Sequence, residues 1–135
     1  AVHVGRWNAS NLKAQVEFAC MDLMEAVSGP FDFIVSNPPY VAPDELTRLQ
    51  REVRDHEPHV ALFASGGPGG DGLKIYRRLI QGAGERLKPG GHLVMEIGMG
   101  MEEQVLRLLG GEWEKLPTKS DLQGIPRTIT ARKSS

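Results

Sequence analysis

The chain has 135 residues, 40% of them hydrophobic, and 16 basic residues nearly balance 17 acidic ones to give a formal net charge of −1. This composition is typical of one soluble domain, and it provides no basic stripe that would follow nucleic-acid phosphates. The single cysteine, Cys20, excludes an internal disulfide, no apolar run approaches the roughly 20 residues that span a bilayer, and the histidines lack metal-ligand spacing. We therefore expect a cytoplasmic protein without a metal site, membrane association or direct nucleic-acid binding.

The first third of the chain alternates helical and strand-like patterns. Residues 1–12 carry apolar side chains at helical spacing, and residues 15–20 are typical of a short strand. Residues 31–36 are apolar almost throughout, which suits a strand buried on both faces of a parallel sheet. A short helix is expected over residues 43–53, with Asp44 near its start.

The second half continues the alternation. A helix is expected over residues 73–87, because Leu73, Tyr76, Ile80, Ala83 and Leu87 form one apolar stripe, although Gly82 and Gly84 weaken it. The remaining expected elements are a strand at 92–97, a helix at 101–109, and two late strands at 112–116 and 127–132 around a loop at 117–126. Such alternation predicts an α/β sheet, in which ligands bind at the carboxyl ends of the strands.

The sequence Asn37-Pro38-Pro39-Tyr40, directly after the strand at 31–36, indicates a specific chemistry. The Asn37 side-chain oxygen and the Pro38 carbonyl can each accept one N–H of an NH2 group, which would fix that nitrogen and orient it. Consecutive prolines stiffen the loop and leave its carbonyls available, while the Tyr40 ring offers a face for a flat group. The pattern is typical of the loop that presents a nitrogen atom for methylation by S-adenosylmethionine (SAM). An ordinary turn at the end of a strand is the alternative interpretation of the tetrapeptide.

Asp22 is the second candidate site residue. It follows the strand expected at 15–20, so it falls at the same edge of the predicted sheet as Asn37. A solvated acidic residue in a loop is the competing interpretation, and position alone does not decide between the two.

Nearly the whole chain resembles the glutamine N5-methyltransferases of translation release factors, the PrmC/HemK family. The tetrapeptide is shared with DNA and RNA methyltransferases, but the ordered set of motifs is more specific. Besides residues 37–40, that set comprises Glu-Val-Arg-Asp-His-Glu-Pro at 52–58, Gly-Asp-Gly-Leu at 70–73, Leu-Lys-Pro-Gly-Gly at 87–91, Glu-Ile-Gly at 96–98, and Asp-Leu-Gln-Gly at 121–124 with Arg127.

This resemblance implies transfer of a methyl group from SAM to the side-chain amide nitrogen of the glutamine in a Gly-Gly-Gln motif of a peptide chain release factor. It implies that Asn37, Pro38 and Tyr40 are catalytic, and that Pro39 joins them in binding the substrate. It also implies a cofactor-binding set of Asp22, Leu23 and Asn37, with Asp22 facing the adenine amino group.

The chain also departs from the family pattern. The glycine-rich loop after the first strand, which receives the methionine end of SAM, is missing, as are the acidic residue that binds ribose and the N-terminal helical substrate domain. We therefore expect residues 1–135 to be the C-terminal part of one SAM-dependent methyltransferase domain. The expected fold is a Rossmann-like α/β methyltransferase sheet of family order 3-2-1-4-5-7-6 that lacks its first two strands, so its third and fourth strands would each have an unpaired edge.

Two other functions remain open on the sequence. One is an RNA or DNA exocyclic amino-group methyltransferase, which shares the Asn37 loop but fits poorly with the missing basic surface. The other is a catalytically inactive interaction module that keeps the substrate loop without a donor pocket.

Overall fold

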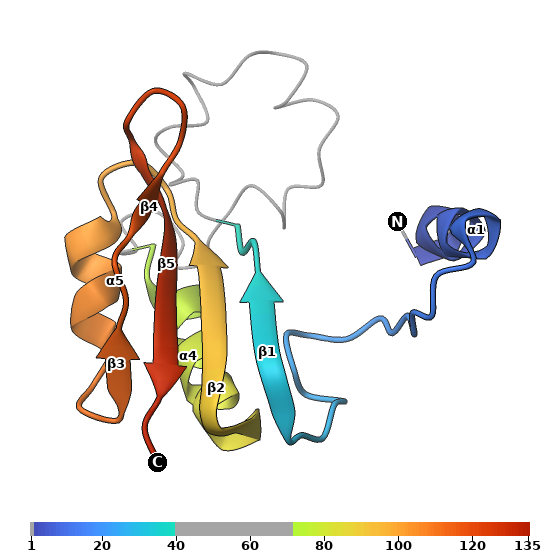
Figure 1. The fold of residues 1–135 in the computed structure, drawn as a ribbon, viewed down its shortest axis with the longest axis horizontal. Helices are drawn as coiled ribbons and strands as arrows, with labels where there is room; N and C mark the ends of the chain where they lie inside the picture. Colours follow the sequence, from blue (N-terminus) through green and yellow to red (C-terminus); the bar gives the residue numbers. More distant parts are fainter. Residues whose placement is uncertain (1, 40–71) are drawn as a thin grey trace.

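A computed structural model describes residues 2–39 and 72–135 (Figure 1). Tyr40 and the helix expected at 43–53 lie outside the described residues. The elements in chain order are α1 (Val2–Leu12), β1 (Phe31–Ser36), α4 (Lys74–Arg86), β2 (Leu87–Glu96), α5 (Glu102–Leu108), β3 (Trp113–Lys115), β4 (Lys119–Ser120) and β5 (Pro126–Lys133).

The strands form one mixed sheet of order β1-β2-β5-β3, and β4 pairs with β5 beyond that path. β1 and β2 are parallel and are joined through α4, whereas β5 runs antiparallel to β2, β3 and β4. The predicted α/β class is confirmed. The order also agrees with the last four strands implied by the family resemblance, 4-5-7-6, if β1 is taken as the fourth strand of the complete sheet.

One face of the sheet carries the core. Leu93 and Met95 of β2 and Ile129 and Ala131 of β5 are fully buried in register with one another. α4 packs against β2, α5 packs against β5, and the two helices contact each other, so both lie on this face. Side chains alternate between the faces of a strand, and the buried set therefore occupies every second position.

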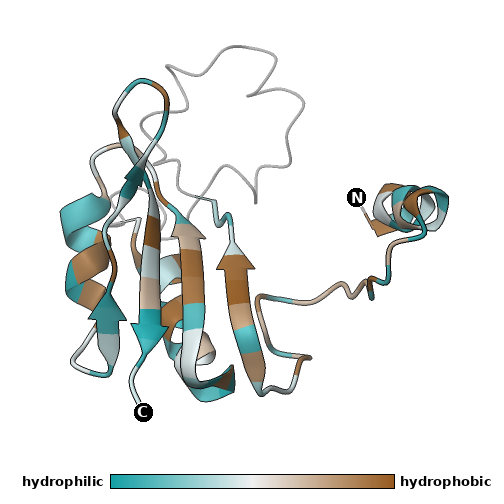
Figure 2. Cartoon of the chain, viewed as in Figure 1, coloured by the Kyte–Doolittle hydropathy of each residue, from teal (hydrophilic) through white to brown (hydrophobic). Residues whose placement is uncertain are grey.

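The opposite face of the sheet is largely exposed to solvent at β1. Phe33 and Val35 are 64% and 73% exposed, and the Phe33 ring stacks on His92 with centroids 5.2 Å apart. Figure 2 shows that β1 is mostly apolar along its length. Among the described residues β1 pairs with β2 alone, so its other edge has no strand beside it, as expected for the fourth strand.

Helix α4 confirms the predicted apolar stripe. All five stripe residues, from Leu73 to Leu87, are buried, together with Leu79. The helix has no glycine cap at its end. Instead, Lys133 Nζ of β5 donates to the carbonyl oxygens of Gly84 at 2.5 Å and Leu87 at 3.0 Å. A cation that binds these carbonyls satisfies acceptors that the helix cannot satisfy itself and complements the helix dipole.

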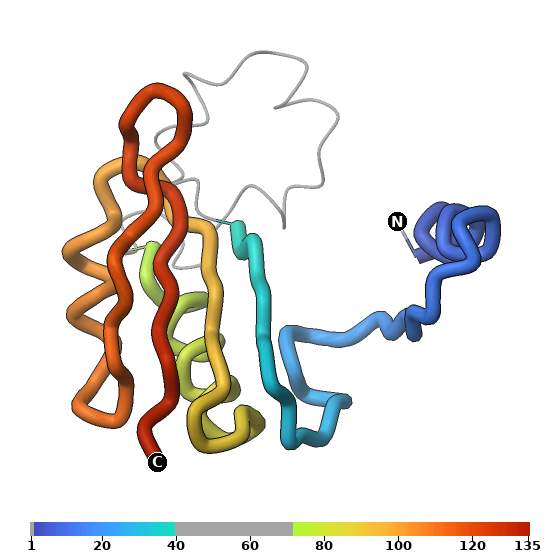
Figure 3. Tube along the Cα trace, in the orientation of Figure 1, coloured from blue at the N-terminus to red at the C-terminus, as the bar shows by residue number. Residues whose placement is uncertain are grey.

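The prediction of a strand at residues 15–20 is wrong. These residues form no regular secondary structure and are mostly exposed. They belong to the segment that connects α1 to the sheet (Figures 1 and 3). Strand geometry depends on a neighbour that satisfies backbone N–H and C=O groups. No strand in the described part of the chain runs beside this segment, so its β-like composition has no ladder to join.

Two boundaries also differ from expectation. β2 begins at Leu87, five residues before the predicted start, but its pairing with β1 is irregular between Phe31 and Phe33, and Gly90 has a φ of +78°. This left-handed residue marks the turn predicted after α4. The loop predicted at 117–126 contains β4, a two-residue strand too short to leave a periodic pattern.

We predict that Leu93→Ala lowers the free energy of unfolding by about 3 kcal/mol, because it opens a cavity in the fully buried layer. The matched change Leu122→Ala should alter it by less than about 0.5 kcal/mol, because Leu122 is fully exposed. Chemical denaturation of both variants measures the two values. Equal losses would contradict this description of the core.

Candidate active site

The candidate substrate loop begins where β1 ends. The β1 ladder stops at Ser36, which lies opposite Met95 of β2. Pro38 and Pro39 follow within three residues and cannot donate backbone hydrogen bonds to continue the ladder. Asn37 is exposed, whereas Pro38 is buried, so the loop is anchored by one proline and presents the amide side chain to solvent.

The hairpin between β4 and β5 stands at the same edge of the sheet. Ser36, Met95 and Ile129 form one row across β1, β2 and β5, two strand spacings or about 10 Å from end to end. One residue further along each strand, Asn37 is level with Thr128. The hairpin therefore starts level with Asn37 and extends beyond the edge at which β1 and β2 end (Figure 1).

Asp121 fixes the conformation of this hairpin. Its Oδ1 accepts hydrogen bonds from the backbone N–H groups of Gln123 at 2.9 Å and Ile125 at 3.0 Å, and its Oδ2 accepts one from Arg127 Nε at 3.1 Å. The hydrogen bond from the Ile125 N–H is the largest of the effects that hold the pKa of Asp121 below its usual range. Burial opposes it, and the interaction with Arg127 and the bond from Gln123 lower the pKa further. The sequence motif at 121–124 therefore encodes a locked turn, a role that sequence reasoning did not assign.

Asp22 and Leu23 lie in an irregular turn. Glu25 N–H donates to the Asp22 carbonyl at 3.2 Å, and Leu23 has a φ of +49°, a left-handed conformation uncommon outside glycine. The Asp22 carboxylate accepts a 2.6 Å hydrogen bond from Arg78 of α4, which also pairs with Glu25 at 3.2 Å. The hydrogen bond and the charge of Asp22 raise the pKa of Arg78, so the guanidinium stays charged.

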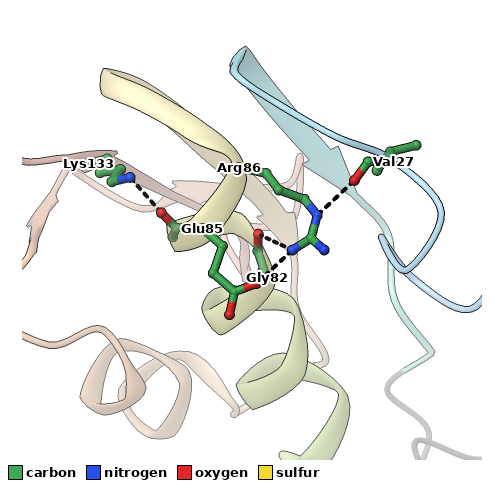
Figure 4. Close-up of polar contacts among 6 residues, drawn as sticks. Val27, Gly82, Glu85, Arg86 and Lys133 are labelled. Atoms are coloured by element: carbon green, nitrogen blue, oxygen red, sulfur yellow. Dashed lines mark hydrogen bonds and ion pairs between the residues drawn. The ribbon is translucent and has the colours of Figure 1, made fainter.

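Further contacts hold this turn against α4. Arg86 Nε donates to the Val27 carbonyl at 2.9 Å while its other nitrogen donates to Gly82 (Figure 4). Gly82 permits the close approach, because a Cβ there would lie 2.8 Å from the Met24 methyl group. Turn and helix together border a pocket of about 190 Å³, lined by Leu23, Met24, Glu25, Arg78, Gln81, Gly82, Glu85 and Arg86.

The predicted site residues therefore fall into two groups. Asn37, Pro38 and Pro39 lie together at the edge of the sheet, whereas Asp22 and Leu23 lie against α4. The strand expected to carry Asp22 to the edge is not formed, and the bordered pocket includes Leu23 but not Asn37.

In residues 2–39 and 72–135, no helix is long and apolar enough to cross a membrane. No group of three or more His, Cys, Asp or Glu side chains in the same ranges is arranged to hold a metal ion.

Comparison with known proteins gives the sequence relationship. Residues 1–56 match the family "Methyltransferase small domain". The release factor glutamine methyltransferase of Koribacter versatilis is 42% identical over 98% of this chain, and that of Bradyrhizobium diazoefficiens is 43% identical over 98%. Along nearly its whole length, the chain is similar to release factor glutamine methyltransferases. It spans 46% and 45% of these two relatives, about half of their length.

Solved structures support the fold of the chain. TrmN from Thermus thermophilus superimposes with a TM-score of 0.64 at 16% identity, covering 97% of this chain and 32% of that one. The N-methyltransferase NodS from Bradyrhizobium japonicum gives a TM-score of 0.53 at 15% identity, covering 98% of this chain and 68% of that one. At such identities the likeness concerns the fold alone, which is a partial Rossmann-like methyltransferase fold.

We predict that Asp121→Asn lowers the Tm at neutral pH, because an amide oxygen accepts the three hydrogen bonds less strongly than a carboxylate. The carboxyl pKa is lower in the folded state than in the unfolded state, so its stabilisation is complete above the ordinary Asp value of about 3.9. It is lost as the pH falls through the folded-state pKa. The Tm difference between native and variant protein should therefore be constant from pH 5 to about 8 and shrink below about pH 4. A difference independent of pH would contradict the ionic role.

Proposed function

We propose that residues 1–135 are the C-terminal part of one SAM-dependent methyltransferase domain. The complete enzyme transfers a methyl group from SAM to the side-chain amide nitrogen of the glutamine in the Gly-Gly-Gln motif of peptide chain release factors. The observation that carries the proposal is the Asn37-Pro38-Pro39 loop at the carboxyl end of β1, with Asn37 exposed, in a chain 42% identical to a release factor glutamine methyltransferase.

The chemistry of the target explains the loop. A glutamine amide nitrogen shares its lone pair with the adjacent carbonyl and is a weak nucleophile, so orientation must contribute much of the rate. Asn37 Oδ1 and the Pro38 carbonyl accept the two N–H bonds, which directs the lone pair at the methyl donor. Tyr40 stacks on the amide plane and Pro39 keeps the loop rigid. The bound amide loses one proton as it gains the methyl group.

The donor half of the site rests on fewer residues. SAM supplies an electrophilic methyl group on a positively charged sulfonium, and Asp22, Leu23 and Asn37 are the residues of this chain that would hold it. Asp22 fits the adenine amino group chemically, because a carboxylate accepts N–H donors. In this structure the carboxylate pairs with Arg78. Both side chains are exposed, so the ion pair contributes little to stability, and the carboxylate can exchange Arg78 for another hydrogen-bond donor.

The partner of the complete enzyme is a peptide chain release factor, and the setting is the cytoplasm, where translation terminates. A net charge of −1 without a basic run supports a protein substrate over RNA or DNA. No membrane and no direct nucleic-acid contact enter the proposed reaction.

We predict that Asn37→Ala in the complete protein lowers methylation by about 100-fold or more, because the amide nitrogen loses one of its two orienting acceptors. The measurement uses labelled SAM, a purified release factor and detection of label on the Gly-Gly-Gln peptide. Asn8→Ala is the matched control, since Asn8 is exposed on α1, away from the loop.

Label on added RNA or DNA, with none on the release factor, would replace the proposal with the nucleobase function. No label on any of these acceptors, with the complete protein folded, would leave the inactive interaction module. Equal activity of native protein and Asn37→Ala would remove the orienting role of Asn37.

A second variant pair tests the donor half. We predict that Asp22→Asn weakens SAM binding about tenfold by calorimetry, because the adenine amino group loses a charged acceptor. Glu25→Gln is the control, because it also loses an ion pair with Arg78 but has no proposed contact with SAM. Equal weakening in both variants would show that the ion pairs of the turn matter, and not the contact of Asp22.

A further inference from the structure

The tip of the β4–β5 hairpin is unusually well fixed for a surface turn. Asp121 receives three hydrogen bonds through its side chain, its backbone N–H donates to the Ile125 carbonyl at 2.9 Å, and its carbonyl accepts from Gly124 at 3.0 Å. Gly124 has a φ of +79°, which a residue with a Cβ rarely adopts. These hydrogen bonds, all within residues 121–127, therefore favour one conformation of the turn.

This fixed turn displays an apolar side chain. Leu122 has an exposed fraction of 107%, the highest of the large apolar residues in the described part of the chain, and both of its sequence neighbours are polar. Burying a leucine would stabilise a protein by about 1.5 to 3 kcal/mol, and in this structure that contribution is not realised. A single exposed leucine is common and proves nothing alone.

The position of the turn supplies the second observation. The Ile97 N–H donates to the Arg127 carbonyl at 2.9 Å, so the base of the hairpin is anchored where β2 ends. In the sheet register Thr128 is level with Asn37, two strands away. Figure 3 shows the hairpin continuing from there beyond the edge of the sheet at which β1 and β2 end, and Leu122 lies in the turn of this hairpin, between β4 and β5.

We propose that Leu122 docks an apolar patch on the folded protein substrate, outside the Gly-Gly-Gln loop that enters the active site. This inference rests on the proposed function, since it concerns the same substrate. Because the backbone of the turn is already ordered, binding through Leu122 costs little further backbone entropy, which favours affinity. A few residues usually carry most of the binding energy of an interface, so loss of one anchoring side chain can change KM measurably.

The test compares Leu122→Asn with Leu122→Met in the complete protein, because the two side chains are similar in size but differ in polarity and neither adds a charge. With an intact release factor as substrate, Leu122→Asn should raise KM about tenfold and leave kcat within about twofold, whereas Leu122→Met should stay within about threefold of native KM. The Kd of the complex between protein and release factor should change in parallel, while the Kd for SAM, the Tm and the molar mass should not change.

Four results would overturn the inference. They are an unchanged KM in Leu122→Asn, a fall in kcat without a rise in KM, a Tm lowered by several degrees, and an altered oligomeric mass. The third would mean that Leu122 packs inside the complete polypeptide, and the fourth that it contacts a second copy. If native protein methylates the release factor and Leu122→Asn is indistinguishable from it, the docking role fails while the proposed function stands. If native protein does not methylate it, the proposed function itself fails.

Discussion

The pairing of β2 on both of its edges is the constraint on which the rest of the structure depends. β2 is hydrogen-bonded to β1, which runs parallel to it, and to β5, which runs antiparallel. Its Leu93 and Met95 are fully buried. Backbone groups at such depth must find partners on both sides, so neither neighbour can shift register without leaving polar groups unpaired. The end of β1 and the start of β5 are thereby placed relative to each other through one strand, and with them Asn37 and the base of the hairpin.

The connection between β1 and β2 is fixed by side chains from distant parts of the chain. Parallel strands require a crossover, and α4 lies in this one. Its last carbonyls bind Lys133 of β5, and Arg86 in its final turn reaches back to the Val27 carbonyl before β1. The helix is thus bonded both to the segment that precedes β1 and to β5, which holds the covered face of the sheet together.

The two halves of the proposed site are supported by interactions of different strength. The substrate half follows directly from a strand with backbone pairing and a buried proline. The donor half lies in a turn held by ion pairs whose side chains are 40% exposed or more, together with the hydrogen bond of Arg86. Exposed ion pairs contribute little to stability, so Asn37 is held more firmly than Asp22.

The sequence by itself determined the element types in the second half of the chain and the position of the Asn37 loop. The apolar stripe of α4 and the apolar run of β1 are recognisable over a few residues, and two consecutive prolines cannot donate the backbone hydrogen bonds that would continue a ladder. The family motifs also implied the strand order that was found. These features could be predicted because each is encoded by neighbouring residues or by motifs read in order.

Tertiary structure decided the rest. Residues 15–20 have the composition of a strand, but a strand exists only beside another, and none runs there in the described part of the chain. Asp22 meets Arg78 across 56 positions of sequence, and the hairpin stands level with Asn37 because β5 returns antiparallel to β2. Such contacts depend on which segments become neighbours in space, and no local pattern of residues records that choice.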